Sequence, residues 1–190
     1  MTRFDAPLYV QAWQQHGVYP LIHNAMADVV TAHTAPGEHV LDLGCSTGLL
    51  GRQMADRGRV VTSLDADTRA MMIGRDAGVF DGIRYYNTRL TPKTMPDVLN
   101  WIADHHPTTV MARRIFPELH DALGTAGLDE FADRLADLGV QQIILEGRMP
   151  SNRMTHPLCT ADREVEALSG RWKVLDTGHG YAHVRVLHVC

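Results

Sequence analysis

The sequence has few cysteines and no long hydrophobic run, and each absence excludes a class of protein. The three cysteines, Cys45, Cys159 and Cys190, form neither a C-x-x-C pair nor an even set, so neither a disulfide framework nor a zinc ribbon is indicated. No stretch reaches the roughly 20 apolar residues needed to cross a bilayer. Residues 1–5 lack the basic start and apolar run of a signal peptide. We therefore expect a cytoplasmic protein without membrane partners.

Charge of one sign is not in strong excess. The formal net charge is −4 at pH 7, which argues against strong non-specific attraction to nucleic acid. With 45% hydrophobic and 21% charged residues over 190 positions, the composition is that of a soluble globular protein. No interdomain linker or internal repeat is visible, so we expect a single domain over residues 1–190, as a monomer or a homodimer.

Several catalytic and binding motifs are also missing. The chain has no G-x-S-x-G nucleophile elbow, no Walker A lysine and no H-E-x-x-H zinc motif. His179 and His183 have i, i+4 spacing but fall in a predicted hairpin, and no third ligand is fixed by spacing, so we expect no metal site. The dinucleotide pattern G-x-G-x-x-G is not matched, because Ser46 stands where its second glycine belongs.

What the sequence does contain is a strand, glycine turn, helix and strand between Val40 and Asp65. Gly44 and Gly48 follow the first apolar run and permit a tight turn and the close approach of a ligand. The helix that begins at Leu49 offers unpaired N–H groups to a carboxylate or phosphate. Asp65 lies 21 residues after Gly44, close to the offset at which an acid reaches ribose hydroxyls. The unit indicates a nucleoside-bearing ligand.

This stretch resembles motif I of the class I S-adenosylmethionine-dependent methyltransferases, which is often written D-x-G-x-G/S-x-G. Asp42, Gly44, Ser46 and Gly48 fill the motif in register, and Asp65 matches the acid that holds the ribose in that family. The resemblance is specific over residues 40–67 and architectural elsewhere. It implies S-adenosylmethionine as the cofactor. The residues that would contact it are Tyr19, Asp42, Gly44, Cys45, Ser46, Gly48, Leu49, Asp65, Ala66 and Thr88. The alternative is an ordinary turn whose glycines serve packing.

The order of apolar patterns predicts the fold class. Strands are expected near residues 40, 60, 83, 108, 143, 172 and 181, and helices at 20–30, 49–57, 68–77, 96–105, 128–138 and 161–168. The alternation predicts an α/β fold: a doubly wound, mostly parallel seven-stranded sheet with helices on both faces and a C-terminal antiparallel hairpin. This is the Rossmann-like methyltransferase fold that the resemblance also implies.

The N-terminal region is predicted to be helical, over residues 8–16 and again from Pro20. Methyltransferases of this class commonly carry such helices before the first strand, folded over the cofactor. The resemblance therefore implies a lid at residues 1–35, before a sheet core at 36–190. Tyr19 is the candidate for contacting the methionine end of the cofactor. Packing of this tyrosine at the helix start is the alternative.

The residues after the third strand depart from the family pattern. An acid there often contacts the adenine amine in the family, whereas this chain has Asn87, Thr88 and Arg89. The amine would then need Asn87, Thr88 or a backbone carbonyl.

The strand near residue 108 runs into Arg113 and Arg114, where relatives that methylate amino groups carry Asn/Asp-Pro-Pro-Tyr/Phe and metal-dependent relatives carry an acid. Two arginines suit a carboxylate or a phosphate, and the loop 148–153 is also basic. An anionic acceptor is predicted, either a small acid or a nucleotide-containing molecule. The candidates for catalysis are Arg113, Glu118 and His120, with Glu146 as a further possible base. The alternatives are a salt bridge for the arginines and ordinary surface positions for the others.

The predicted function is methyl transfer from S-adenosylmethionine to an oxygen or nitrogen atom. A sulfonium methyl group is already activated, so the protein must chiefly align donor and acceptor. Two alternatives remain: a non-catalytic module that binds the cofactor as a partner or sensor, and an NAD-type dehydrogenase. Ser46 and the terminal hairpin speak against the dehydrogenase.

Overall fold

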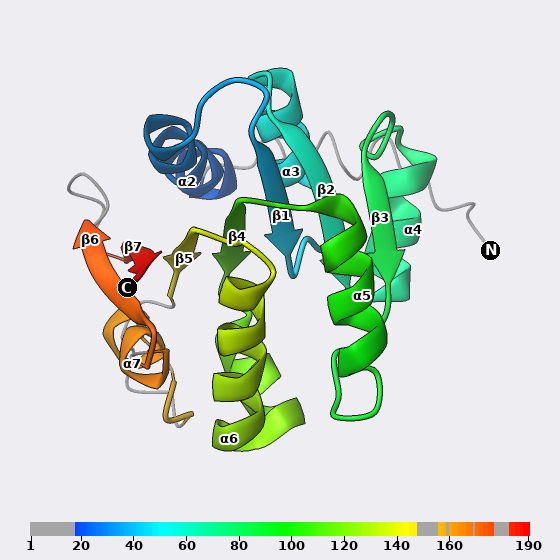
Figure 1. Ribbon diagram of the computed structural model, residues 1–190. Helices are drawn as coiled ribbons and strands as arrows, with labels where there is room; N and C mark the ends of the chain where they lie inside the picture. Colours follow the sequence, from blue (N-terminus) through cyan, green and yellow to red (C-terminus); the bar gives the residue numbers. More distant parts are fainter. Residues whose placement is uncertain (1–17, 148–155, 159, 169, 177–182) are drawn as a thin grey trace.

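The computed structural model describes residues 18–147, 156–158, 160–168, 170–176 and 183–190, with side chains from residue 23 onward (Figure 1). The strands are β1 His39–Leu43, β2 Val60–Asp65, β3 Arg84–Asn87, β4 Thr109–Arg113, β5 Gln142–Glu146, β6 Trp172–Asp176 and β7 Val184–Val189. The helices are α2 Val18–His33, α3 Leu49–Asp56, α4 Thr68–Asp76, α5 Met95–His105, α6 Phe116–Asp137 and α7 Ala161–Ala167. The helix predicted at 8–16, the basic loop 148–153, the side chain of Tyr19 and the turn of the terminal hairpin lie outside the described residues.

One seven-stranded sheet runs through the molecule in the order β3-β2-β1-β4-β5-β7-β6. Strands β1 to β5 are parallel to one another, and β7 lies antiparallel between β5 and β6. The predicted fold class is therefore confirmed, including the closing antiparallel hairpin. The strand order reverses between β1 and β4, and ligands of such sheets bind beyond the carboxyl ends of the strands at this point.

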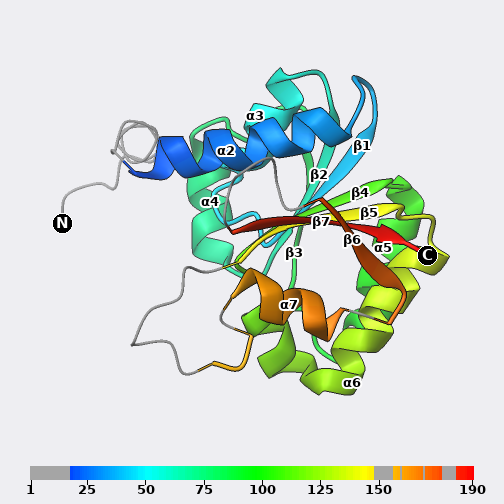
Figure 2. The ribbon, with the colours of Figure 1, turned by 90° about the vertical axis from the view of Figure 1, so that its left-hand side faces the viewer.

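Helices cover both faces of the sheet (Figure 2). Apolar residues of α2, α3 and α4 pack on one face, and those of α5, α6 and α7 pack on the other. Strand β1 shows the alternation: Val40 joins the first core, whereas Leu41 and Leu43 join the second. Because helices cover both faces, the central strands are buried along most of their length. Of the described helices, none is long and apolar enough to cross a membrane.

Helix α6 differs from the sequence prediction, which had only residues 128–138 as helical. It begins at Phe116, and Gly124 (φ 69°, ψ 175°) interrupts it. Pro117 occupies the first turn, where proline is favoured, and Phe116 and Leu119 are buried at helical spacing. Glu118 and His120 are therefore both on this helix, which begins shortly after the end of β4.

The glycine turn after β1 is held closely by its neighbours. Gly44 and Gly48 both have φ of 78°, a conformation that favours glycine. Gly74 of α4 packs directly against the turn, because a Cβ added there would lie 2.2 Å from the Thr47 carbonyl oxygen. The close packing of α4 therefore fixes the shape of the turn.

We predict that Gly74→Ala destabilises the protein. The added methyl group cannot fit against the Thr47 carbonyl, so the free energy of unfolding should fall by about 1–3 kcal/mol, in spite of alanine's better helix propensity. Urea unfolding measures the change. The control is Gly170→Ala, where the added Cβ meets nothing within 4 Å. Equal stability of the two variants would contradict this account of the turn.

Asp42 is a buried acid in the middle of β1. It is 2% exposed, and its Oδ2 accepts a hydrogen bond of 3.0 Å from the backbone N–H of Gly51 in α3. Burial raises the pKa of Asp42 from 3.8 to about 7, and the charge of Asp65 adds to the rise, whereas the Gly51 N–H and Arg113 oppose it. The ionised form is therefore disfavoured in the folded state.

We predict that Asp42→Asn raises stability in a pH-dependent way. The folded pKa lies above the unfolded value, so the native state binds more protons between about pH 4 and pH 7. Stability of the unmodified protein should consequently fall as the pH rises through this window. Asparagine still accepts from Gly51 but carries no charge. The variant should match the unmodified protein below about pH 4 and exceed it by about 1–4 kcal/mol at pH 8. Thermal melts across this range test it, and parallel stability curves would contradict it.

Candidate functional site

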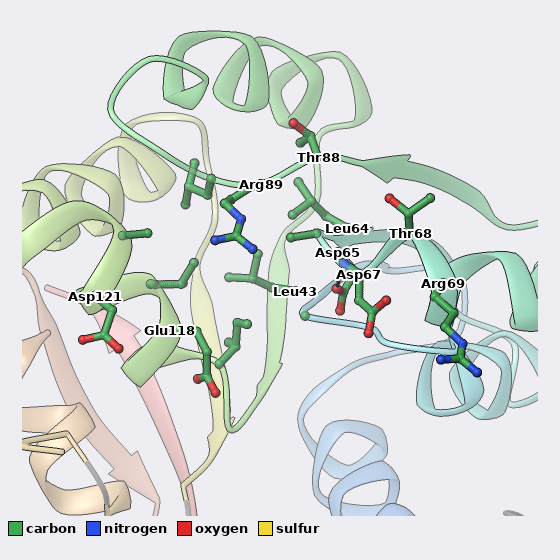
Figure 3. A pocket seen from close by; sticks show the side chains of 16 residues that line it. Leu43, Leu64, Asp65, Asp67, Thr68, Arg69, Thr88, Arg89, Glu118 and Asp121 are labelled. Atoms are coloured by element: carbon green, nitrogen blue, oxygen red, sulfur yellow. Dashed lines mark hydrogen bonds between the residues drawn. The ribbon is translucent and has the colours of Figure 1, made fainter. Parts of the chain in front are cut away.

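A cavity of about 720 Å³ lies beyond the carboxyl ends of β1 and β2 (Figure 3). Its walls come from the glycine turn, the link from β2 to α4, the loop after β3 and the start of α6. The lining residues are Leu43, Gly44, Leu64, Asp65, Ala66, Asp67, Thr68, Arg69, Thr88, Arg89, Leu90, Ile115, Glu118, Leu119, Asp121 and Ala122. We call it the larger cavity. Four of the predicted cofactor contacts, Gly44, Asp65, Ala66 and Thr88, line it.

Asp65 connects the glycine turn to the end of β2. Its Oδ2 accepts a hydrogen bond of 2.7 Å from the backbone N–H of Ser46, and its Oδ1 accepts one of 2.6 Å from the N–H of Asp67. The side chain also lines the larger cavity. Because an ionised carboxylate has about four acceptor sites, both oxygens can still accept from a ligand hydroxyl.

Asn87 at the end of β3 and Thr88 directly after it are the two side chains that the sequence offered as partners for the adenine amine, and they differ in their surroundings. The Asn87 amide is used internally: its Oδ1 accepts from Thr68 Oγ1 at 2.7 Å, and its Nδ2 donates to the Asp65 carbonyl at 2.9 Å. Thr88, in contrast, lines the larger cavity. Arg89 lines it too and was not predicted.

A smaller hollow of about 120 Å³ lies on the other side of the glycine turn. It is lined by His23, Asp42, Gly44, Cys45, Ser46, Thr47, Leu49, Leu50 and Arg113. Five predicted cofactor contacts therefore gather here, and Gly44 lines both hollows. Gly48 lines neither hollow. It lies against Phe80, whose ring would be 2.5 Å from an added Cβ.

The two arginines after β4 share one buried acid. Arg113 Nε donates to Glu146 Oε2 at 2.7 Å, and Arg114 Nε donates to Glu146 Oε1 at 3.0 Å. Glu146 is 4% exposed, and both of its oxygens are occupied. One carboxylate against two guanidinium groups leaves one positive charge in excess. Within the described part of the chain, the buried Nη2 of Arg113 has no hydrogen-bond partner.

His23 is a site residue that sequence reasoning missed. It lies on α2 and lines the smaller hollow with Asp42 and Arg113. Burial, together with the positive charges of Arg113 and Arg114, lowers its pKa from 6.5 to about 4. The imidazole is therefore neutral at physiological pH. The helical periodicity of α2 concerns its apolar positions and gave no indication of this residue.

The three predicted catalytic residues do not meet in one hollow. Arg113 lines the smaller hollow, Glu118 lines the larger cavity, and His120 lines neither. His120 packs instead against the ring of His156, with 5.4 Å between ring centroids. Asp121, which was not predicted, lines the larger cavity and accepts a hydrogen bond of 3.0 Å from His156 Nε2.

Comparison of the sequence with protein-family models and with curated proteins gave no match. The structure, however, is similar to solved methyltransferase structures. One is the bifunctional kinase-methyltransferase WbdD, with a TM-score of 0.67 and 17% identity over 99% of this chain and 43% of that one. Across the WbdD structures, this chain spans 38% to 44% of their length.

Two smaller proteins match over nearly their whole length. A TehB-like S-adenosylmethionine-dependent methyltransferase from Corynebacterium glutamicum has a TM-score of 0.63 and 12% identity over 97% of this chain and 98% of that one. N-methyltransferase NodS from Bradyrhizobium japonicum, solved with S-adenosyl-L-homocysteine, has a TM-score of 0.63 and 12% identity over 97% of each chain. The chain therefore has the class I methyltransferase fold.

Proposed function

We propose that the protein binds S-adenosylmethionine and transfers its methyl group to an oxygen or nitrogen atom of an anionic acceptor. The observation that carries this proposal is the position of Asp65, a strand-end carboxylate that holds the glycine turn and lines the larger cavity. A sheet that matches methyltransferases, including one solved with S-adenosyl-L-homocysteine, supports it. The antiparallel β7 also departs from the classic dinucleotide-binding sheet, which speaks against the dehydrogenase alternative.

The two hollows suit the two halves of the cofactor. Asp65 would hold the ribose hydroxyls in the larger cavity, with Ala66 and Thr88 beside the adenine. The smaller hollow would take the methionine end, which carries an ammonium and a carboxylate group. Its walls offer one group for each: the acid Asp42 and the unpartnered Nη2 of Arg113. When bound, the cofactor supplies an activated methyl group on a sulfonium.

The protein's own part in the reaction is to position the acceptor and, where the acceptor carries a proton, to remove it. Of the acids considered from the sequence, Glu118 lines the larger cavity and can serve as a base. Glu146 is poorly suited, because both of its oxygens already bind arginines. A base role for His120 has no geometric support in the larger cavity.

The charge of the acceptor is inferred from the corner where β4 and β5 end. Arg113 and Arg114 together exceed the charge of Glu146 by one. Burial is the main cause of the low pKa of His23, and the positive charges of both arginines add to it. An anionic group is therefore favoured near this corner. The lid at residues 1–35 stays a prediction, to which His23 of α2 lends support by lining the smaller hollow.

We predict that Asp65→Ala weakens binding of S-adenosyl-L-homocysteine by about tenfold or more, which corresponds to about 1.4 kcal/mol. The variant loses both the ribose partner and the hydrogen bonds to Ser46 and Asp67. Isothermal titration calorimetry measures the affinity. The control is Asp67→Ser, which removes a carboxylate from the same cavity but keeps an oxygen to cap α4 at Ala70. Unchanged affinity in Asp65→Ala, or an equal loss in Asp67→Ser, would contradict the ribose assignment.

We predict that the Arg113→Met variant will show whether Arg113 binds the carboxylate of the cofactor or the anionic group of the acceptor. If Nη2 binds the carboxylate of the cofactor, affinity for S-adenosyl-L-homocysteine should fall about tenfold, while affinity for 5′-methylthioadenosine, which lacks the amino-acid end, should not change. If it binds the acceptor, both affinities should stay and methyl transfer should be lost. Equal weakening of both ligands would show a structural role and contradict the proposal. Glu146 keeps Arg114 as a partner in this variant.

A further inference from the structure

We propose that His120, Asp121 and His156 form a binding site for one first-row transition-metal cation at the rim of the larger cavity. One ring nitrogen of each histidine and one carboxylate oxygen of Asp121 lie within 4.8 Å of one another. His120 and Asp121 come from α6, and His156 comes from a segment between β5 and α7. The site uses none of the residues assigned above to the cofactor.

The distances are close to those of a metal shell. His156 Nε2 and Asp121 Oδ1 are 3.0 Å apart. Metal–nitrogen and metal–oxygen bonds of about 2.0–2.2 Å place neighbouring ligands about 3–3.5 Å apart. The ligand atoms that are up to 4.8 Å apart must come closer together. Rotation of the Asp121 side chain, which is 72% exposed, can bring its carboxylate closer to the histidines.

The donor set indicates which cations fit. Two imidazoles and one carboxylate suit zinc, cobalt, nickel or iron, whereas calcium and magnesium prefer oxygen ligands. Three protein ligands leave at least one coordination position open. Asp121 lines the larger cavity from α6, on the opposite side from Asp65 (Figure 3). The site is therefore within reach of that cavity.

His120 is held as a metal ligand often is. Its Nε2 lies 3.2 Å from Thr125 Oγ1, and its buried Nδ1 has no hydrogen-bond partner among the described residues. A ligating histidine usually donates its other ring N–H to a neighbouring oxygen, which fixes the tautomer. In the tautomer that carries its proton on Nε2, this N–H donates to Thr125 Oγ1 and the lone pair of Nδ1 is available for a cation.

His156 must give up a hydrogen bond when the cation binds. The backbone N–H of Leu158 donates to His156 Nδ1 at 3.0 Å, so the ring proton sits on Nε2 and points to Asp121. A cation on Nε2 displaces this proton, and a neutral ring then carries its proton on Nδ1. The Leu158–His156 hydrogen bond is therefore broken, and the Leu158 amide reports occupancy.

The sequence led us to expect no metal site. Asp121 and His156 are 35 residues apart, which matches no recognised ligand spacing, and the fold alone brings them together. An occupied site would add positive charge at the cavity rim, which suits the anionic acceptor. That use rests on the proposed function, but cation binding does not.

The test is titration of the EDTA-treated protein with Co²⁺, followed by visible absorption and by calorimetry. We expect one saturable Co²⁺ per chain, with competition by Zn²⁺ and a shift of the Leu158 amide resonance. His120→Gln, Asp121→Asn and His156→Gln should each weaken binding by about tenfold or more. Asp121→Asn changes a largely exposed side chain, so it should fold normally, as circular dichroism can verify.

The matched control is His106→Asn, which removes an exposed histidine at the end of α5 and places a residue that tolerates its left-handed backbone (φ 50°). Absence of saturable Co²⁺ binding, or equal binding by the three site variants and the control, would overturn the proposal. Titration with S-adenosyl-L-homocysteine in parallel separates the two hypotheses. If the unmodified protein binds S-adenosyl-L-homocysteine but not Co²⁺, the metal site is rejected. If it binds Co²⁺ but not S-adenosyl-L-homocysteine, the proposed function is rejected.

Discussion

The interaction on which the site depends is the pair of hydrogen bonds that Asp65 accepts from the backbone of Ser46 and Asp67. Ser46 has φ of 53°, a left-handed conformation that costs a non-glycine residue about 1–2 kcal/mol. The charge-assisted bond of 2.7 Å to Asp65 offsets this cost. The carboxylate assigned to the ribose thus also shapes the turn that would receive the cofactor.

The charged groups near this turn influence one another's ionisation. Glu146 neutralises one of the two guanidinium groups. The remaining positive charge adds to the lowering of the pKa of His23 and partly opposes the rise in the pKa of Asp42. Burial acts on these two groups in opposite directions, because it disfavours the charged form of each. Near neutral pH, the smaller hollow therefore holds a neutral imidazole, a partly protonated acid and an incompletely paired arginine. The hollow thus offers an acid and a guanidinium group to the two charged groups at the amino-acid end of the proposed cofactor.

The sequence was sufficient for the sheet and the glycine turn, because both are recorded in local patterns. Apolar runs ending in Asp42 and Asp65 predicted β1 and β2, and the glycines predicted the turn between them. The sequence was insufficient where the partner of a side chain is a residue far away in the chain. Whether Arg113 faces a substrate or an acid depends on Glu146, 33 residues away. His23 reaches the site only through the packing of α2 on the sheet.

The geometry of α6 explains why the predicted catalytic residues separate. An α-helix turns by about 100° per residue, so Glu118 and His120 point in directions about 200° apart. Glu118 and Asp121, at i and i+3, share a face and both line the larger cavity. His120 consequently turns toward Thr125 and His156. In a strand, residues two apart share a face, whereas the helix points these two side chains in different directions. A histidine two residues from an acid in sequence is therefore no evidence of joint action until the local period is known.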